Sequence, residues 1–204
     1  MKVHVKHYKS SNEGIILKRK YLDWKDMLCT FKKENFFQEK ALLKHLSGNY
    51  AVGLLKTDTL EKYYYSSTRI KDENQFRSFK DHIARSGAPT AIKEKWLKMV
   101  QDLYYTSPFV FKYINVDRSR GIRTEEAFPR FHDSESKIIE NMSDYMFTHG
   151  IANVSAYIYT HKEPCLNCEL VFQQFIDRYP LSEITIFYNQ LNYVSVPSKY
   201  NWRY

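Results

Sequence analysis

Two short motifs constrain this chain more than any other feature: Asp-Ser-Glu at 133–135 and Pro-Cys-Leu-Asn-Cys at 164–168. Side chains at positions i and i+3 lie on one side of a helix, so Cys165 and Cys168 can place both sulfurs on one metal ion. This pairing leaves room for one more protein ligand and a water, as a hydrolytic zinc site requires. Bound zinc lowers the pKa of its water to about 7, and a non-ligand carboxylate such as Glu135 can move the proton. The motifs therefore predict one Zn²⁺ ion that serves a hydrolytic reaction.

The residues around both motifs predict alternating helices and strands. Apolar residues at helical spacing predict a helix over 134–149, and alternation predicts a strand over 151–160. A second helix is predicted over 165–179 and a second strand over 183–188. Because a strand, a helix and a strand follow one another, the two strands are expected to be parallel. Both motifs then begin helices at one edge of the same sheet.

The rest of the chain predicts further elements around this unit. The expected elements are a short helix over 36–46, a β-hairpin from 50–56 and 61–67, and insert helices over 72–84 and 92–103. Residues 1–34 lack sustained periodicity, which favours an irregular or weakly stranded extension of unknown role. A chain of 204 residues with 43% apolar content can bury one ordinary core. We therefore expect this extension and one domain at 35–204, with a catalytic core at about 128–190.

The chain is basic, because 31 Lys and Arg residues against 23 Asp and Glu residues give a net charge of +8. This balance favours a polyanionic partner such as nucleic acid, although charge for solubility alone is the simpler explanation. An arginine-rich segment precedes the first motif. Its candidate substrate contacts, with two aromatic residues, are Arg118, Arg120, Arg123, Phe128, Arg130 and Phe131. These residues favour contact with nucleic acid, because arginine binds phosphate and stacks on bases. A solvated loop without a binding role is the alternative explanation of the same composition.

Cysteine usage and the N-terminal segment bear on the compartment. Three cysteines cannot form a disulfide framework, and Cys29 is expected to be a buried or idle thiol. Residues 1–6 lack the apolar stretch of a signal peptide, and no run approaches the roughly 18 apolar residues of a membrane span. We therefore expect a soluble protein without a membrane partner, whose route of delivery the sequence does not show.

The order of elements and motifs resembles the cytidine deaminase superfamily, whose signature is His/Cys-x-Glu followed by Pro-Cys-x-x-Cys. The segments 131–140 (FHDSESKIIE) and 159–168 (YTHKEPCLNC), with FQQF at 172–175 after them, look most like the deaminase domains of bacterial polymorphic toxins. The resemblance covers residues 128–188 and extends back to about residue 36. It implies a three-layer α/β fold, in which helices flank a mixed β-sheet and a helical insert is added, and one catalytic zinc.

The resemblance also assigns roles residue by residue. Cys165 and Cys168 match the two thiolate ligands, and Glu135 matches the acid that shuttles protons. Pro164 matches the proline that shapes the loop before the thiols. The superfamily carries His or Cys two residues before the glutamate, and this chain departs from that pattern with Asp133.

Two adjacent residues compete for the place of the third ligand. Asp133 stands in register with the family's ligand, and a carboxylate binds zinc at about 2.0–2.2 Å. His132 is the chemically attractive competitor, but its use requires the helix to begin slightly differently. Taken alone, Asp133 and Glu135 would predict only a helix N-cap and a charge that complements the helix dipole.

The resemblance implies that the protein deaminates an amino-substituted base, with cytosine favoured over adenine and DNA over RNA. The zinc-activated water attacks C4 of cytosine, and this requires a single-stranded or flipped base. The resemblance further implies a bacterial toxin effector that acts in the cytoplasm of a target cell and has a cognate immunity protein. We expect it to act as a monomer.

Three other functions remain open from the sequence. A Cys-x-x-Cys segment after a strand is also the layout of a thioredoxin-like redox site, which predicts a reversible disulfide and no zinc. A zinc-stabilised binding module predicts zinc without any dependence on Glu135. A deaminase of free nucleosides shares the chemistry, but the basic insert favours a polymeric substrate.

Overall fold

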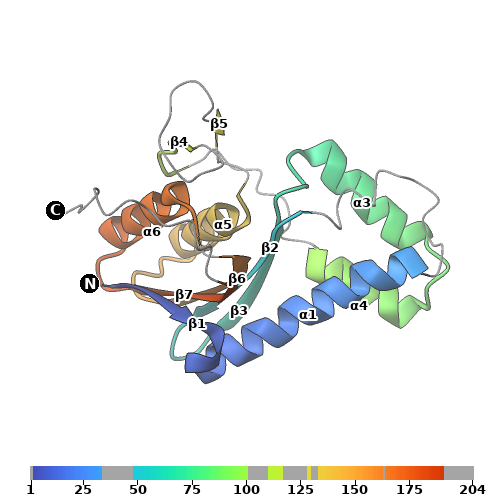
Figure 1. Ribbon diagram of the computed structural model, residues 1–204, viewed down its shortest axis with the longest axis horizontal. Coiled ribbons are helices and arrows are strands. Elements are labelled where there is room, and N and C mark those ends of the chain that lie inside the picture. The colour runs from blue at the N-terminus through green and yellow to red at the C-terminus, as the bar shows by residue number, and fades with distance from the viewer. Residues whose placement is uncertain are drawn as a thin grey trace.

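A computed structural model describes residues 2–33, 48–100, 110–116, 128–129, 133–162 and 164–190 (Figure 1). The helices are α1 (Asn12–Lys33), α3 (Glu73–Arg85), α4 (Thr90–Val100), α5 (Ser134–Thr148) and α6 (Leu166–Arg178), with a 3-10 turn η1 (Tyr8–Ser10). The strands are β1 (Val3–His7), β2 (Tyr50–Lys56), β3 (Glu61–Ser67), β4 (Asn115–Val116), β5 (Phe128–Pro129), β6 (Ser155–Lys162) and β7 (Glu183–Gln190). The α/β class predicted from the sequence is confirmed.

Five strands form one mixed sheet in the order β1-β7-β6-β2-β3, and β4 pairs separately with β5. Strands β1, β7 and β6 run parallel, whereas β2 pairs antiparallel with both β6 and β3. The predicted parallel pair around the second motif is therefore confirmed as β6 and β7. The predicted hairpin is confirmed as β2 and β3, which pair along their whole length. Tyrosines in both strands and Val52 in β2 are the strand-forming residues between the turn residues.

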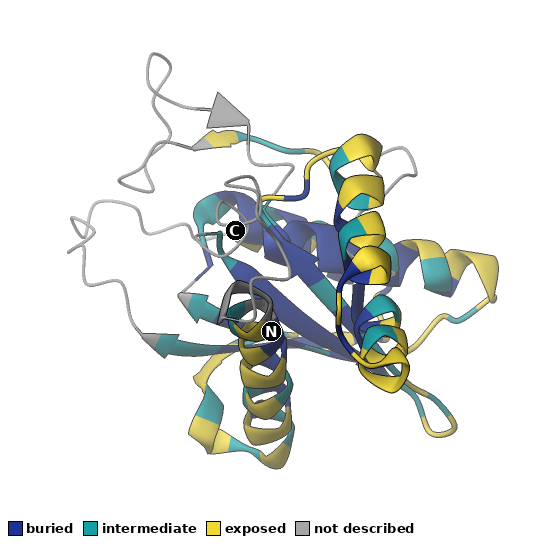
Figure 2. Cartoon of the chain, turned by 90° about the vertical axis from the view of Figure 1, so that its right-hand side faces the viewer, coloured by how far each residue is buried: buried dark blue, intermediate teal, exposed yellow. Residues whose placement is uncertain are grey.

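Helices cover both faces of the sheet and bury it as the middle layer (Figures 1 and 2). Successive side chains of β2 point to opposite faces of the sheet and so belong to two separate cores. Val52 packs with the apolar stripe of α1, whereas Leu55 packs with α5 and α6. The insert helices α3 and α4 contribute Phe79 and Trp96 to the core on the α1 side. The three layers and the helical insert expected from the sequence are present.

The N-terminal residues were expected to be irregular or weakly stranded. The structure has the strand β1, but a long helix, α1, replaces the irregular part. β1 pairs with β7 along its whole length, and α1 is a continuous helix. Leu17, Tyr21 and Trp24 of α1 are buried against the sheet. Charged residues between these positions hide the narrow apolar stripe in the sequence, and burial against the sheet decides the structure.

Other differences between prediction and structure are small or lie outside the described residues. The strand β6 begins at Ser155 rather than at residue 151, and Val154 is already held by a bond from its N–H to the Ser182 hydroxyl. The insert helix predicted to reach residue 103 is described as far as Val100. The helix predicted over 36–46 lies outside the described residues.

Gly53 lies in the middle of β2 beneath α5 and determines how closely this helix approaches the sheet. A Cβ atom at this position would lie 2.5 Å from Cγ2 of Ile138 and 2.8 Å from Cε of Met142. Both separations are far below van der Waals contact, and the Ile138 methyl group is branched at Cβ and close to its own backbone. The close approach of α5 matters for the site because the first motif lies at the start of this helix.

Gly53→Ala is expected to lower the free energy of unfolding by about 1–3 kcal/mol, because the added methyl overpacks the contact with α5. Urea unfolding followed by circular dichroism measures this change. An unchanged midpoint with an unchanged slope would contradict the close packing of α5 on β2.

Candidate active site

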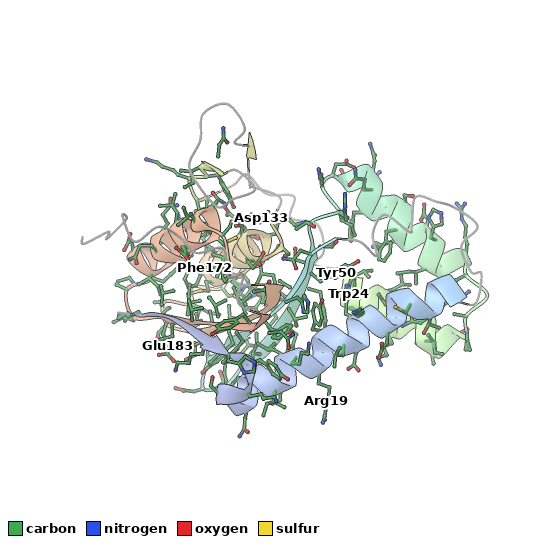
Figure 3. The ribbon with its side chains drawn as sticks, in the orientation of Figure 1. Arg19, Trp24, Tyr50, Asp133, Phe172 and Glu183 are labelled. Atoms are coloured by element: carbon green, nitrogen blue, oxygen red, sulfur yellow. The ribbon has the colours of Figure 1, made fainter. Side chains whose placement is uncertain are left out.

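The two motifs lie at the N-terminal ends of α5 and α6, which pack side by side on one face of the sheet (Figures 1 and 3). Asp133 occupies the N-cap position of α5 but its side chain makes no capping hydrogen bond. Cys165 occupies the N-cap position of α6, also without a side-chain cap. Pro164 is buried directly before it. The simpler explanation of Asp133 as a side-chain N-cap is therefore wrong.

Asp133, Cys165 and Cys168 form a compact triangle of potential metal ligands. Cys165 Sγ lies 3.2 Å from Asp133 Oδ2 and 3.5 Å from Cys168 Sγ, and Cys168 Sγ lies 3.8 Å from Asp133 Oδ2. Tetrahedral zinc with Zn–S near 2.3 Å and Zn–O near 2.0 Å has ligand separations of about 3.5–3.8 Å. The donor set and its spacing therefore fit zinc, and these three residues of the described part of the chain would fill three of the four positions of a tetrahedral ion.

Glu135 is almost fully buried, with 3% of the residue's surface exposed. It accepts hydrogen bonds from the Thr160 hydroxyl at 2.6 Å and the Ser134 hydroxyl at 2.9 Å. The Asn49 amide adds a longer contact of 3.4 Å. Burial, with a smaller contribution from the charge of Asp133, raises the pKa of Glu135, and the hydroxyl donors oppose this rise. A carboxyl group with a raised pKa is suited to accept and return a proton near neutral pH.

Cys168 is the more deeply buried of the two motif thiols. The hydroxyl of Ser136 donates to its sulfur at 3.6 Å, from the turn of α5 that also carries Glu135. The hydrogen bond with Cys165 and the burial raise the pKa of Cys168 well above its usual value. A bound cation would reverse this effect, because a coordinated thiol is deprotonated outright. The thiolate form of Cys168 is thus favoured by a positive charge at the triangle.

Several residues predicted for the site lie outside the part of the chain that the structure describes. These are His132, Phe131, Arg130, Arg118, Arg120 and Arg123, and Phe128 is described only by its backbone. Their roles in metal or substrate binding stay predictions. Asp133, the candidate third ligand that lies within the described residues, is placed beside both thiols.

The sequence did not identify the residues that hold Glu135. Thr160 ends the buried part of β6, and Asn49 directly precedes β2, so 25 and 86 positions separate them from Glu135. Neither residue belongs to a recognisable motif. Only the pairing of β2 with β6, where Ala51 faces Thr160, brings these side chains to one end of the sheet.

Comparison with known families decides what this arrangement belongs to. The profile of the toxin deaminases described as the BURPS668_1122 family of deaminases matches residues 30–190 of the chain. The chain belongs to this family of deaminases. The match runs from the last turn of α1 to the end of β7 and covers both motifs. The predicted membership of the cytidine deaminase superfamily is confirmed, and with it a hydrolytic deaminase.

Two further observations accompany this match. Searches of curated proteins and of solved structures each found no significant similarity to the chain. Among the described helices, none combines the length and the apolar character needed to cross a membrane.

The buried carboxylate of the deaminase site has a measurable cost in the metal-free protein. The pKa of Glu135 is raised in the folded protein. The stability that its protonated side chain contributes is therefore fully present below the ordinary pKa of 4.5, and it is lost as pH rises through the folded-state pKa. Glu135→Gln is therefore expected to raise the unfolding temperature of the metal-free protein at pH 7–8 and to change it little near pH 4. Thermal unfolding with a chelator and a reductant measures both values. A variant that is less stable than the wild type at pH 8 would contradict the raised pKa.

Proposed function

We propose that this deaminase is zinc-dependent, converts cytosine to uracil in nucleic acid, with DNA favoured, and serves as a toxin-type effector. The observation that carries the proposal is the placement of a buried carboxylate, Glu135, at the same helix start as Asp133 of the triangle, close enough for the charge of Asp133 to raise its pKa. A metal-activated water and a nearby carboxylate are the two parts that hydrolytic deamination of a base requires.

Asp133, Cys165 and Cys168 would hold the zinc ion. When bound there, zinc supplies a water that is activated for attack near neutral pH. Asp133 begins α5 and both thiols begin α6, so the ligands rest on two helices that are fixed against one sheet. Rigid elements of this kind hold a site with little reorganisation during the reaction.

Glu135 would move the protons of the reaction. Its carboxylate accepts a proton from the water as the oxygen adds to C4 of cytosine, and it delivers that proton to N3 of the ring. Glu135 would then take the remaining proton from the hydroxyl group added at C4 and deliver it to the amino group. The bond between C4 and that nitrogen breaks, the C4–oxygen bond becomes a carbonyl, and ammonia leaves with uracil as the product. Thr160 and Ser134 orient the carboxylate through their hydroxyl groups. Such acid–base catalysis contributes about 10²–10⁴-fold to the rate.

The basic character of the chain supports a polymeric substrate. A net charge of +8 attracts a phosphate backbone, and C4 of a paired base is out of reach until the base leaves the stack. We assign the backbone contacts to the arginine-rich segment that precedes the first motif, together with Phe128 and Phe131 as candidate stacking partners.

Two rival functions use the same cysteines but leave parts of the site unexplained. A dithiol that exchanges disulfides has no use for the Asp133 carboxylate in contact with both sulfurs or for the buried Glu135. A zinc-stabilised binding module explains the triangle but not why a carboxylate is kept buried beside it. Both features have a use in a deaminase.

Incubation of the purified protein with single-stranded and double-stranded DNA, the same sequences as RNA, and free cytidine tests the substrate. Sequencing reports base changes in the polymers, and chromatography reports uridine. We expect C-to-T changes in DNA. Conversion of cytidine alone would contradict the polymeric substrate, and A-to-G changes would contradict the choice of base.

A further inference from the structure

Lys137 is a buried lysine of α5 that the proposed chemistry does not use. Its side chain is 2% exposed, and its ammonium group donates to the carbonyl oxygen of Ser67 and, at 2.7 Å, to that of Ile70. Burial lowers the pKa of Lys137 to about 7, an effect that the charge of Asp133 opposes. Lysine is almost never fully buried, so a chain that keeps one at this position bears a cost in stability.

The two carbonyl groups belong to the turn that leaves β3 at Ser67 and reaches Ile70. Between them lies Thr68, which is joined to Asn49 by a pair of hydrogen bonds. The N–H of Thr68 donates to the carbonyl of Asn49 at 3.0 Å, and the N–H of Asn49 donates to the hydroxyl of Thr68 at 3.0 Å. Thr68 in this turn therefore holds both the N–H and the carbonyl group of Asn49.

The side chain of Asn49 completes a circuit back to α5. Its amide nitrogen lies 3.4 Å from both Glu135 Oε1 and the hydroxyl oxygen of Ser134. The circuit thus leaves α5 at Lys137, passes through the turn and Asn49, and returns to the same helix at Glu135. Contacts of 3.4 Å are at the long end of hydrogen bonding, so small movements of the turn would break them.

We propose that Lys137 is a positioning residue of the deaminase, which holds the turn from Ser67 to Ile70 so that Asn49 stays against Glu135. This inference rests on the proposed function. Lys137 would act through the turn, because its ammonium group donates to the carbonyl oxygens of Ser67 and Ile70. A lysine suits this task because its ammonium group has several N–H donors and can bond to the carbonyl oxygens of Ser67 and Ile70 at the same time.

The test compares Lys137→Met with Lys71→Met, which removes an exposed lysine from the end of the same turn. Misplacing a catalytic group by about 1 Å can cost about 10²-fold, so we expect Lys137→Met to lower kcat by about 10- to 10²-fold. KM and the zinc content should stay close to those of the wild type. Amide hydrogen exchange of Asn49 and Thr68 should become at least about 10-fold faster as their mutual bonds open. Lys71→Met should keep both its kcat and its exchange rates.

Thr68→Val provides a second route, because it removes the acceptor for the N–H of Asn49 and preserves the shape of the side chain. It should also lower kcat, and in its background Lys137→Met should cost less than it does alone. Should Lys137→Met fail to fold, an unchanged kcat in Thr68→Val would overturn the proposal. Equal turnover and exchange in the wild type and Lys137→Met would likewise overturn it. Absence of turnover in the wild type would instead overturn the proposed function, and the positioning role with it.

Discussion

Replacing Glu135 with glutamine is expected to lower deamination by about 10²–10⁴-fold while one zinc ion stays bound. Glutamine keeps the size of the side chain and can still accept from the Thr160 hydroxyl, but it cannot accept the proton of the attacking water. The effect should fall on kcat rather than on KM, because the proton moves in the transition state. Single-turnover assays with a cytosine-containing strand, together with metal analysis, measure both quantities.

A matched control for this variant is Glu169→Gln, on the exposed side of the first turn of α6. It removes the same charge close to the second motif and should retain the wild-type rate. Retained turnover in Glu135→Gln would contradict a role of Glu135 in the chemistry. An inactive Glu135→Gln variant that has also lost its zinc, and regains turnover when zinc is restored, would contradict this role as well.

Replacing Cys168 with serine is expected to lower zinc affinity by more than about 100-fold, because even the loss of an outer hydrogen-bond partner costs about 10–100-fold. Deamination should disappear with the metal. Cys29→Ser is the matched control, since this third thiol lies on α1 and is not part of the triangle. Competition with a zinc-binding dye measures the affinities. Full zinc binding by Cys168→Ser would contradict the proposed ligand set.

The same assay decides between the two candidates for the third ligand. Asp133→Asn should weaken zinc binding, because Asp133 Oδ2 is the oxygen that lies within 3.8 Å of both sulfurs. His132→Ala should bind zinc as the wild type does. The opposite pattern would assign the third position to His132.

Local patterns in the sequence predicted the part of the fold that carries the chemistry. The motifs, the helices α5 and α6 and the strands after them are each encoded by short-range periodicity, and the parallel pairing of β6 and β7 follows from their order. Once these elements were placed, Asp133 and Cys165 were expected to meet at one edge of the sheet. The sulfur of Cys165 and the carboxylate of Asp133 are indeed 3.2 Å apart.

Long-range pairing carries what the sequence did not predict. Asn49 reaches Glu135 only because β2 lies beside β6, and no local pattern marks an asparagine before a strand as part of a site. Lys137 looks like an ordinary charged residue of an amphipathic helix, yet its side chain is buried. α1 was missed because its charged residues outnumber its buried stripe, which is stable only against the sheet.

The site also illustrates why such residues are kept despite their cost. A buried Glu135 and a buried Lys137 both have pKa values shifted toward their neutral forms, which is unfavourable for the stability of the charged protein. Substitutions that relieve this cost are expected to stabilise the fold and to lower activity, as is common for functional sites.

One measurement tests the central proposal most directly: sequencing of DNA and RNA after incubation with the wild type and with Glu135→Gln, with zinc quantified in both proteins. We expect one zinc ion per chain in each protein and C-to-T changes in DNA with the wild type alone. Zinc without base changes in any polymer would contradict deamination of nucleic acid, and base changes by a zinc-free wild type would contradict the metal's role.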